Sequence, residues 1–171
     1  TVRLESAAPP VESDTPLFDA IPERQTNHRP FDDETVPDAL SSRFEQFARR
    51  EGVGIELITD PARRETVAAL QTRADERQFE NPAYREELAH WIGTGALGAN
   101  WLTARIGQLA VRHLDVGERE GQKNSKLLTS APVLVVLTAN AADRVNSLRA
   151  GRAFERMALA ATSADLAVHP M

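Results

Sequence analysis

The sequence contains no cysteine, and it contains no hydrophobic run of the roughly 18 residues that a membrane-spanning helix needs. Without cysteine the chain cannot form disulfides, thiolate metal sites or a cysteine nucleophile, and this composition is typical of intracellular proteins. Segment 1–16 is polar and rich in proline, so it lacks the pattern of a signal peptide. We therefore expect a cytoplasmic protein that has no membrane partner.

Basic residues are fewer than acidic ones. The 171 residues include 20 Lys and Arg against 25 Asp and Glu, which gives a formal net charge of -5. This balance argues against a nucleic-acid partner bound through a broad basic surface, so an anion has to be bound by a local cluster of cations. With 42% hydrophobic and 26% charged residues, the composition predicts one globular domain with its own core.

Sequence patterns of common catalytic and metal sites are also missing. The four histidines are scattered, and none is spaced from another histidine or a carboxylate as metal ligands on a helix face are, so we expect no metal site. No G-x-S-x-G motif supplies a serine nucleophile. Residues 93–98 have the spacing G-x-G-x-x-G, but they follow a predicted helix and not a strand, which favours an interhelical loop over a dinucleotide site. We therefore identify no catalytic side chain.

Apolar spacing and capping residues predict a mainly helical chain. Helices are predicted over 16–21, 37–51, 60–77, 82–92, 101–114 and 143–162. In the helix over 101–114, the spacing predicts that Leu102, Ile106 and Leu109 face the core, with Val111 as a further candidate. Segment 117–126 is dense in charge and glycine, so we expect a mobile surface loop there, and residues 1–14 are expected to form an extended arm.

Three segments are predicted to be strands. Residues 54–59 are rich in branched side chains, and 133–137 form a continuous apolar run that is typical of a strand covered on both faces. Residues 166–168 begin a further strand after the helix over 143–162, and this crossover predicts that 133–137 and 166–168 are parallel. The many small residues of that helix predict that another element packs very close to it. The expected fold class is α+β.

The segment from Arg24 to Phe31 is the strongest candidate for a binding site. It concentrates two arginines, a histidine, a threonine and an asparagine in eight residues. Guanidinium groups bind phosphate through two parallel charge-assisted hydrogen bonds, and short polar side chains add neutral donors. The alternative is a solvated loop whose charge is balanced by the acidic residues at 32–34.

With its ending Arg29-Pro30-Phe31, this segment resembles the flavin phosphate signature of the nitroreductase superfamily, and it is especially similar to the branch with two lobes. Segments 130–137, 149–156 and 168–171 resemble that family's strand, central helix and next strand. The resemblance implies a nitroreductase-like domain over 15–171, with helices around a small mixed or antiparallel central sheet. Since relatives continue further, it also implies an incomplete lobe, truncated at its carboxyl end.

The resemblance implies FMN as the cofactor, with both arginines toward the phosphate and ribityl chain and the last two residues near the flavin ring. The implied cofactor-binding residues are Arg24, Thr26, Asn27, His28, Arg29, Pro170 and Met171. Family members place a basic residue six positions before the Phe, where this chain has Gln25. Arg24 stands one residue earlier, which puts its contact in doubt more than that of Arg29.

The implied activity is that of an FMN-dependent oxidoreductase, which passes electrons from NAD(P)H to a nitroaromatic, a quinone or a similar small aromatic acceptor. Because the cofactor carries the electrons, no acid–base pair of the protein is required. The implied partner is a second nitroreductase-like lobe or a homodimer partner, with the helix over 143–162 as the expected contact. Alternatives are a flavin-binding or sequestering protein without productive turnover, and a lobe that only pairs with a functional one.

Overall fold

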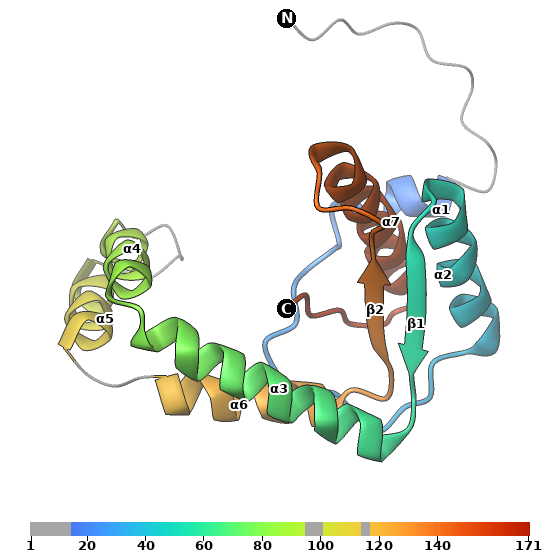
Figure 1. The fold of residues 1–171 in the computed structure, drawn as a ribbon. Helices are drawn as coiled ribbons and strands as arrows, with labels where there is room; N and C mark the ends of the chain where they lie inside the picture. Colours follow the sequence, from blue (N-terminus) through green and yellow to red (C-terminus); the bar gives the residue numbers. More distant parts are fainter. Residues whose placement is uncertain (1–14, 95–100, 114–116) are drawn as a thin grey trace, which may run out of the picture. The chain divides into compact units, whose positions relative to one another are not determined.

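The computed structural model describes residues 15–94, 101–113 and 117–171. The predicted arm over 1–14 and most of the glycine-containing segment 93–98 lie outside these ranges. The chain is divided into two compact units, of which the first comprises Thr1–Ile58 and Pro132–Met171, and the second Thr59–Ala131. The predicted α+β class is confirmed, because helices predominate and a small antiparallel sheet accompanies them (Figure 1). None of the helices in the described ranges has an apolar stretch long enough to cross a membrane.

Unit 1 contains the sheet, which is formed by β1 (Gly54–Ile58) and β2 (Leu134–Thr138). The two strands are antiparallel, with Gly54 opposite Thr138 and Ile58 opposite Leu134. Because Ile58 ends β1 directly opposite the start of β2, unit 2 is inserted at the point where a hairpin turn would join them.

The predicted parallel pairing of 133–137 with 166–168 is wrong. Within the described ranges β2 pairs with β1, and Val168 forms an isolated parallel bridge with Thr26. The physical reason is the end of the preceding helix. Asp165 adopts a left-handed conformation with φ of 56°, and Leu166 N–H donates to the Ala161 carbonyl at 2.9 Å, which turns the chain back after the helix. The backbone of 166–168 then finds its partner in the basic segment.

Three helices build the core of unit 1, namely α1 (Thr15–Asp19), α2 (Asp38–Glu51) and α7 (Arg144–Thr162). Phe44 and Phe47 of α2 are buried in a cluster that includes Ala153 and Ala160 of α7, both with no exposed surface. Burial of each phenylalanine contributes roughly 1.5–3 kcal/mol. The small residues Ala153 and Ala160 of α7 are thus packed against α2, whereas Gly151 of the same helix has no atom within 4 Å of a built Cβ.

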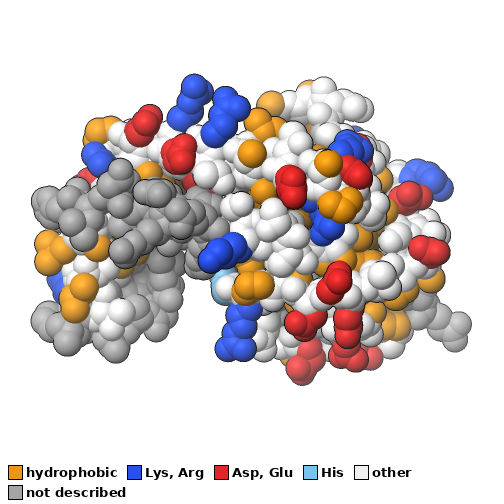
Figure 2. Space-filling model, turned by 90° about the horizontal axis from the view of Figure 1, so that it is seen from below, with side chains coloured by type: hydrophobic (Ala, Val, Ile, Leu, Met, Phe, Trp, Pro, Cys, Tyr) orange, Lys and Arg blue, Asp and Glu red, His pale blue; other side chains and the backbone are white. Residues whose placement is uncertain are grey.

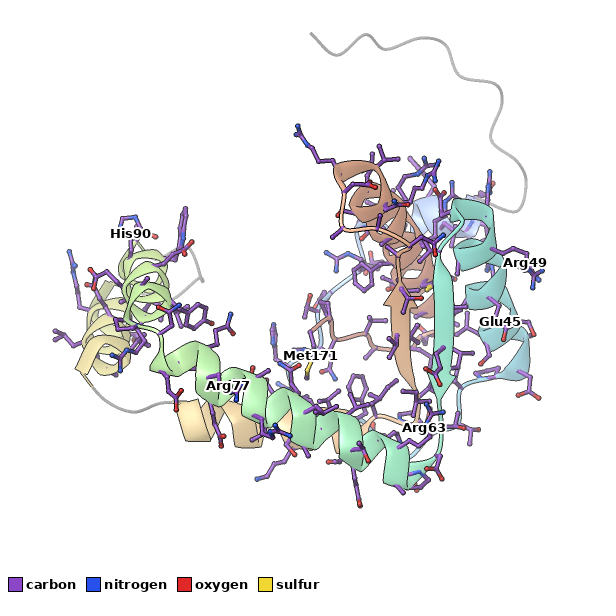
Figure 3. The ribbon with its side chains drawn as sticks, viewed as in Figure 1. Glu45, Arg49, Arg63, Arg77, His90 and Met171 are labelled. Carbon is purple, nitrogen blue, oxygen red and sulfur yellow. The ribbon has the colours of Figure 1, made fainter. Side chains whose placement is uncertain are left out.

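The polar face of α2 is on its outer side. Glu45 and Arg49, one turn apart, both project away from β1 (Figure 3). Gly52 directly follows the predicted helix over 37–51, and it adopts a left-handed conformation with φ of 67° that terminates α2. The buried Glu51 carboxylate forms an ion pair with Arg152 of α7 at 3.1 Å. Unit 1 is thus joined through α2 and α7 by both apolar packing and an ion pair.

Unit 2 is helical. Its elements are α3 (Pro61–Glu80), α4 (Pro82–Gly93), α5 (Trp101–His113) and α6 (Gly117–Ser130). Helix α3 packs along α6, and α4 packs along α5 (Figure 1). The Asp60 and Asn81 side chains cap α3 and α4 by accepting hydrogen bonds from the backbone N–H groups of Arg63 and Ala83. Both capping residues directly precede a proline, and the predicted starts of these helices are confirmed.

Two expectations for unit 2 are wrong. Segment 117–126, expected as a loop, forms most of α6. The packing of this helix against α3 outweighs the low helix preference of its local composition. Leu127 and Leu128 are buried, and Asn124 donates a hydrogen bond of 2.9 Å to the buried Asp75 carboxylate of α3.

The second error concerns the face of α5 that is buried. Ile106 and Leu109 are 61% and 58% exposed, whereas the further candidate Val111 is buried as expected. The side chain of Leu102 lies outside the described residues. A Cβ atom on Gly107 would lie 3.1 Å from Cγ2 of Ile92 in α4. The absence of a side chain at Gly107 thus leaves room for Ile92, and this face of α5 packs against α4.

Candidate functional site

The predicted basic segment connects α1 to α2 and lies beside the carboxyl end of the chain. Thr26 forms the parallel bridge with Val168, and Asn27 N–H donates to the Val168 carbonyl at 2.9 Å. His169 Nδ1 donates to the Asn27 carbonyl. The basic segment and residues 168–171, two of the segments that carried the resemblance, are therefore neighbours within unit 1, although they are more than a hundred residues apart in the sequence.

An open groove of about 1030 Å³ lies along this junction. Its lining comes from α1 and the turn after it, from the basic segment, and from the end of α7 with the residues that follow. These residues are Pro16, Asp19, Ala20, Glu23, Gln25, Thr26, Asn27, His28, Arg29, Thr162, Ser163, Asp165, Leu166 and Ala167. Pockets for small organic ligands and cofactors commonly have about 300–1,000 Å³, so this groove is large enough for such a ligand.

The two arginines of the basic segment have different surroundings. Arg29 lines the groove and is exposed, and its guanidinium makes no hydrogen bond or ion pair with any other residue that the structure describes. Arg24 is not part of the groove lining. Its Nε lies 3.6 Å from Oε1 of Glu155 on α7, in a partly exposed pair of the kind that contributes about 0–1 kcal/mol. Arg29 is therefore the arginine whose donors are available to an anion in the groove.

The groove also contains acidic side chains. Asp19 and Glu23 line it from α1 and the turn that follows, and Asp165 lines it from the end of α7. On the face drawn in Figure 2, basic side chains are scattered among acidic and hydrophobic ones and form no continuous basic surface. An anion would thus be attracted at Arg29 and repelled near the three carboxylates, which restricts where in the groove it can bind.

Asn27 has a structural role inside the basic segment. Its Oδ1 accepts the Arg29 backbone N–H at 3.0 Å, and its Nδ2 donates to the Arg29 carbonyl at 2.7 Å. The amide side chain thereby fixes the backbone of the residue two positions further on. The loop that carries the Arg29 guanidinium is consequently held from within.

The histidines are less scattered in space than in the sequence. The rings of His28 and His169 lie edge to face, with centroids 5.5 Å apart and planes at 80°. In the ranges that the structure describes, no group of three or more His, Asp or Glu side chains is arranged to hold a metal ion. No local signal could have paired residues 28 and 169, because only the tertiary structure brings them together.

Four of the seven predicted cofactor-binding residues line the groove, namely Thr26, Asn27, His28 and Arg29. Arg24, Pro170 and Met171 do not, and the last two are exposed at the carboxyl end of unit 1, where Figure 3 labels Met171. The lining residues from α1 and from the end of α7 were missed, because nothing in their local sequence distinguishes them from ordinary capping and surface residues.

No protein-family model, curated protein or solved structure matches this chain. The fold and the groove themselves define an α+β protein with a helical insertion and a ligand-sized groove in unit 1. Membership of the nitroreductase superfamily stays a prediction that rests on the sequence motifs.

Proposed function

We propose that unit 1 binds FMN in this groove, and that the protein is a cytoplasmic FMN-dependent oxidoreductase of the nitroreductase type. Its substrates would be NAD(P)H and a nitroaromatic, quinone or similar acceptor. The observation that carries the proposal is the convergence of the basic segment with residues 166–169 beside one groove of cofactor size. The basic segment and residues 168–169 belong to the segments that carry the sequence resemblance, and a shared cofactor is a physical reason for them to meet.

Arg29 is the residue proposed to bind the FMN phosphate. Its guanidinium is exposed in the groove and has no partner among the described side chains, so it can form two parallel hydrogen bonds with phosphate oxygens. Hydrogen bonds to charged groups contribute about 1.5–3 kcal/mol each. The three carboxylates of the lining do not fit a phosphate, but they can accept hydrogen bonds from the hydroxyl groups of the ribityl chain.

The hydroxyl of Thr26 can donate or accept a further hydrogen bond in the groove, and that of Ser163, which donates to the Ala160 carbonyl at 2.9 Å, can accept one. Bound FMN supplies the hydride and electron transfer, so the residues of this chain have to hold and orient it. Because FMN supplies the electron transfer, the proposal requires no general acid or base from the chain.

A second lobe or a second copy of the chain belongs to the proposal, because an open groove leaves much of a flavin ring uncovered. The first turns of α7 are the proposed contact. Val145 and Leu148 are 59% and 65% exposed there, whereas residues 157–161 of the same helix are buried. Exposed apolar side chains on one element are a common feature of protein interfaces.

The test is an absorption spectrum of the purified full-length protein with and without added FMN, followed by anaerobic addition of NADH or NADPH. We expect a flavin spectrum that the reduced nicotinamide bleaches. A protein that stays colourless and ignores FMN would contradict the proposal. Flavin that is reduced by dithionite but not by either nicotinamide would instead indicate a flavin-sequestering protein.

Substitution of the two arginines tests the proposed roles. Arg29→Ala should weaken FMN binding about 10- to 100-fold, since charge-assisted hydrogen bonds to the phosphate are lost. Arg24→Ala is the matched control, because Arg24 pairs with Glu155 outside the groove, and it should change FMN affinity by less than about threefold. Equal losses for the two variants, measured by fluorescence titration of FMN, would show that the phosphate is not held by Arg29.

A further inference from the structure

We infer that Asn27 and His169 are positioning residues, which hold Arg29 in place for the phosphate and are not themselves ligands of the cofactor. The inference rests on the proposed function, because the anion is the phosphate of FMN. It differs from what the sequence resemblance implies, since there Asn27 is expected to contact the cofactor directly. The distinction follows from the hydrogen bonds that Asn27 already makes.

All four polar groups of Asn27 are engaged. Its N–H donates to the Val168 carbonyl at 2.9 Å, and its carbonyl accepts from His169 Nδ1. Its side chain accepts from the Arg29 N–H at 3.0 Å and donates to the Arg29 carbonyl at 2.7 Å. The main chain of Asn27 is thus bound to the carboxyl-terminal segment, and its side chain is bound to Arg29.

The chemistry of an asparagine amide is specific to this arrangement. The side chain has to accept from one backbone group of Arg29 and donate to another, and the amide offers an acceptor and a donor on the same carbon. Alanine offers neither group, and aspartate offers no donor. Without these two hydrogen bonds, the backbone around Arg29 would sample other conformations. The guanidinium would have to be ordered when the phosphate binds, and this ordering lowers the affinity for FMN.

His169 acts on Arg29 indirectly, because its hydrogen bond is to Asn27. A carbonyl oxygen can only accept, so Nδ1 of His169 carries the hydrogen in its bond to Asn27. Together with the bridge between Thr26 and Val168, this bond keeps the basic segment beside the end of the chain. His169 therefore influences Arg29 through Asn27, although it does not belong to the groove lining.

A double-mutant cycle on the full-length protein tests the role of Asn27. FMN and riboflavin, which lacks the phosphate, are titrated into the wild type, Asn27→Ala, Arg29→Ala and the double variant. We expect Asn27→Ala to weaken FMN binding about tenfold and to leave riboflavin binding within about twofold. In the Arg29→Ala background, Asn27→Ala should have no further effect on FMN, because the group that it positions is gone. An equal loss in both backgrounds would overturn the inference and make Asn27 a direct ligand.

Two matched variants complete the experiment. Asn81→Ala removes a capping asparagine from unit 2, where Oδ1 accepts the Ala83 N–H at 3.0 Å, and it should leave FMN affinity unchanged. His169→Ala should weaken FMN binding several-fold, whereas His169→Asn should restore most of it, because its amide nitrogen can donate to the Asn27 carbonyl from a similar position. Equal FMN affinities of the two His169 variants and the wild type would remove His169 from the inference.

Hydrogen exchange separates this inference from the proposed function. The backbone amide of Arg29 is bonded to Asn27 Oδ1, so Asn27→Ala should make it exchange at least several-fold faster in the absence of any ligand. Unchanged exchange would overturn the positioning role whatever the ligand is. A wild type that binds no FMN, or an Arg29→Ala variant with full affinity, would contradict the proposed function while faster exchange in Asn27→Ala would still support the positioning role.

Discussion

Asp165 combines an uncommon backbone conformation with a place in the candidate site. Among the residues in the described ranges, it is the non-glycine residue with a positive φ, which is 56°. Asp165 also lines the groove at the end of α7. This conformation is sterically unfavourable for residues with a Cβ atom, although aspartate tolerates it better than most. Gly52, which terminates α2 with φ of 67°, has no Cβ atom and adopts it without steric strain.

These two residues give a pair of opposite predictions for stability. Asp165→Gly should raise the free energy of unfolding, and Gly52→Ala should lower it, each by about 1 kcal/mol. No atom lies within 4 Å of a Cβ built on Gly52, so its loss would be conformational and not steric. Urea denaturation followed by circular dichroism measures both. A destabilised Asp165→Gly variant would mean that the carboxylate makes contacts worth more than the backbone strain.

At the scale of the element, α7 depends on its amino-terminal cap. Oδ1 of Asp143 accepts the Asn146 backbone N–H at 2.8 Å, and Oδ2 accepts from the Asn146 side chain at 2.8 Å. The backbone hydrogen bond first, and then the side-chain bond, lower the pKa of Asp143 below its ordinary value. The charged carboxylate is therefore the form that stabilises the start of this helix.

The sign of the pH dependence follows from the lowered pKa. The contribution of Asp143 is present above the pKa that the group has in the unfolded chain, about 3.9, and it is lost as the pH falls through the lower folded pKa. The stability advantage of the wild type over Asp143→Asn, which keeps an acceptor but no charge, should therefore shrink between pH 7 and about pH 3. Thermal unfolding of both proteins at the two pH values measures this. An advantage that stays constant would contradict the assigned cause.

At the scale of the whole molecule, the two units have separate cores and the candidate site belongs to one of them. Every residue of the groove lining is in unit 1. Unit 2 is inserted in the chain between Ile58 and Leu134, and these two residues are directly opposite each other in the sheet. A short turn is therefore enough to connect β1 to β2 without unit 2.

Excision of residues 59–133 and their replacement by Asn-Gly should leave unit 1 folded. We expect cooperative thermal unfolding, and FMN affinity within about threefold of the full-length chain, because the core and the groove residues are retained. A control with the same excision and Arg29→Ala should lose the phosphate-dependent part of the affinity. Loss of flavin binding in a folded excision variant would assign part of the site to unit 2.

The sequence by itself determined the features that depend on near neighbours along the chain. Asp60, Asn81 and Asp143 begin helices, Gly52 ends one, and the basic segment with Arg29 is readable at once, because capping and turn chemistry act over a few residues. Residues 54–58 and most of 133–137 were also recognised as strands, because their branched and apolar side chains suit a covered sheet.

Only the tertiary structure decided which segments meet. The pairing of β1 with β2, the bridge between Thr26 and Val168, the contact of His28 with His169 and the outward face of α5 all depend on partners that are distant in the sequence. Such contacts are selected by the burial and hydrogen bonding available to the whole folded chain, which outweigh local propensity. The groove is a product of these long-range contacts, and for that reason the sequence alone did not assign Asp19, Glu23 and Asp165 to its lining.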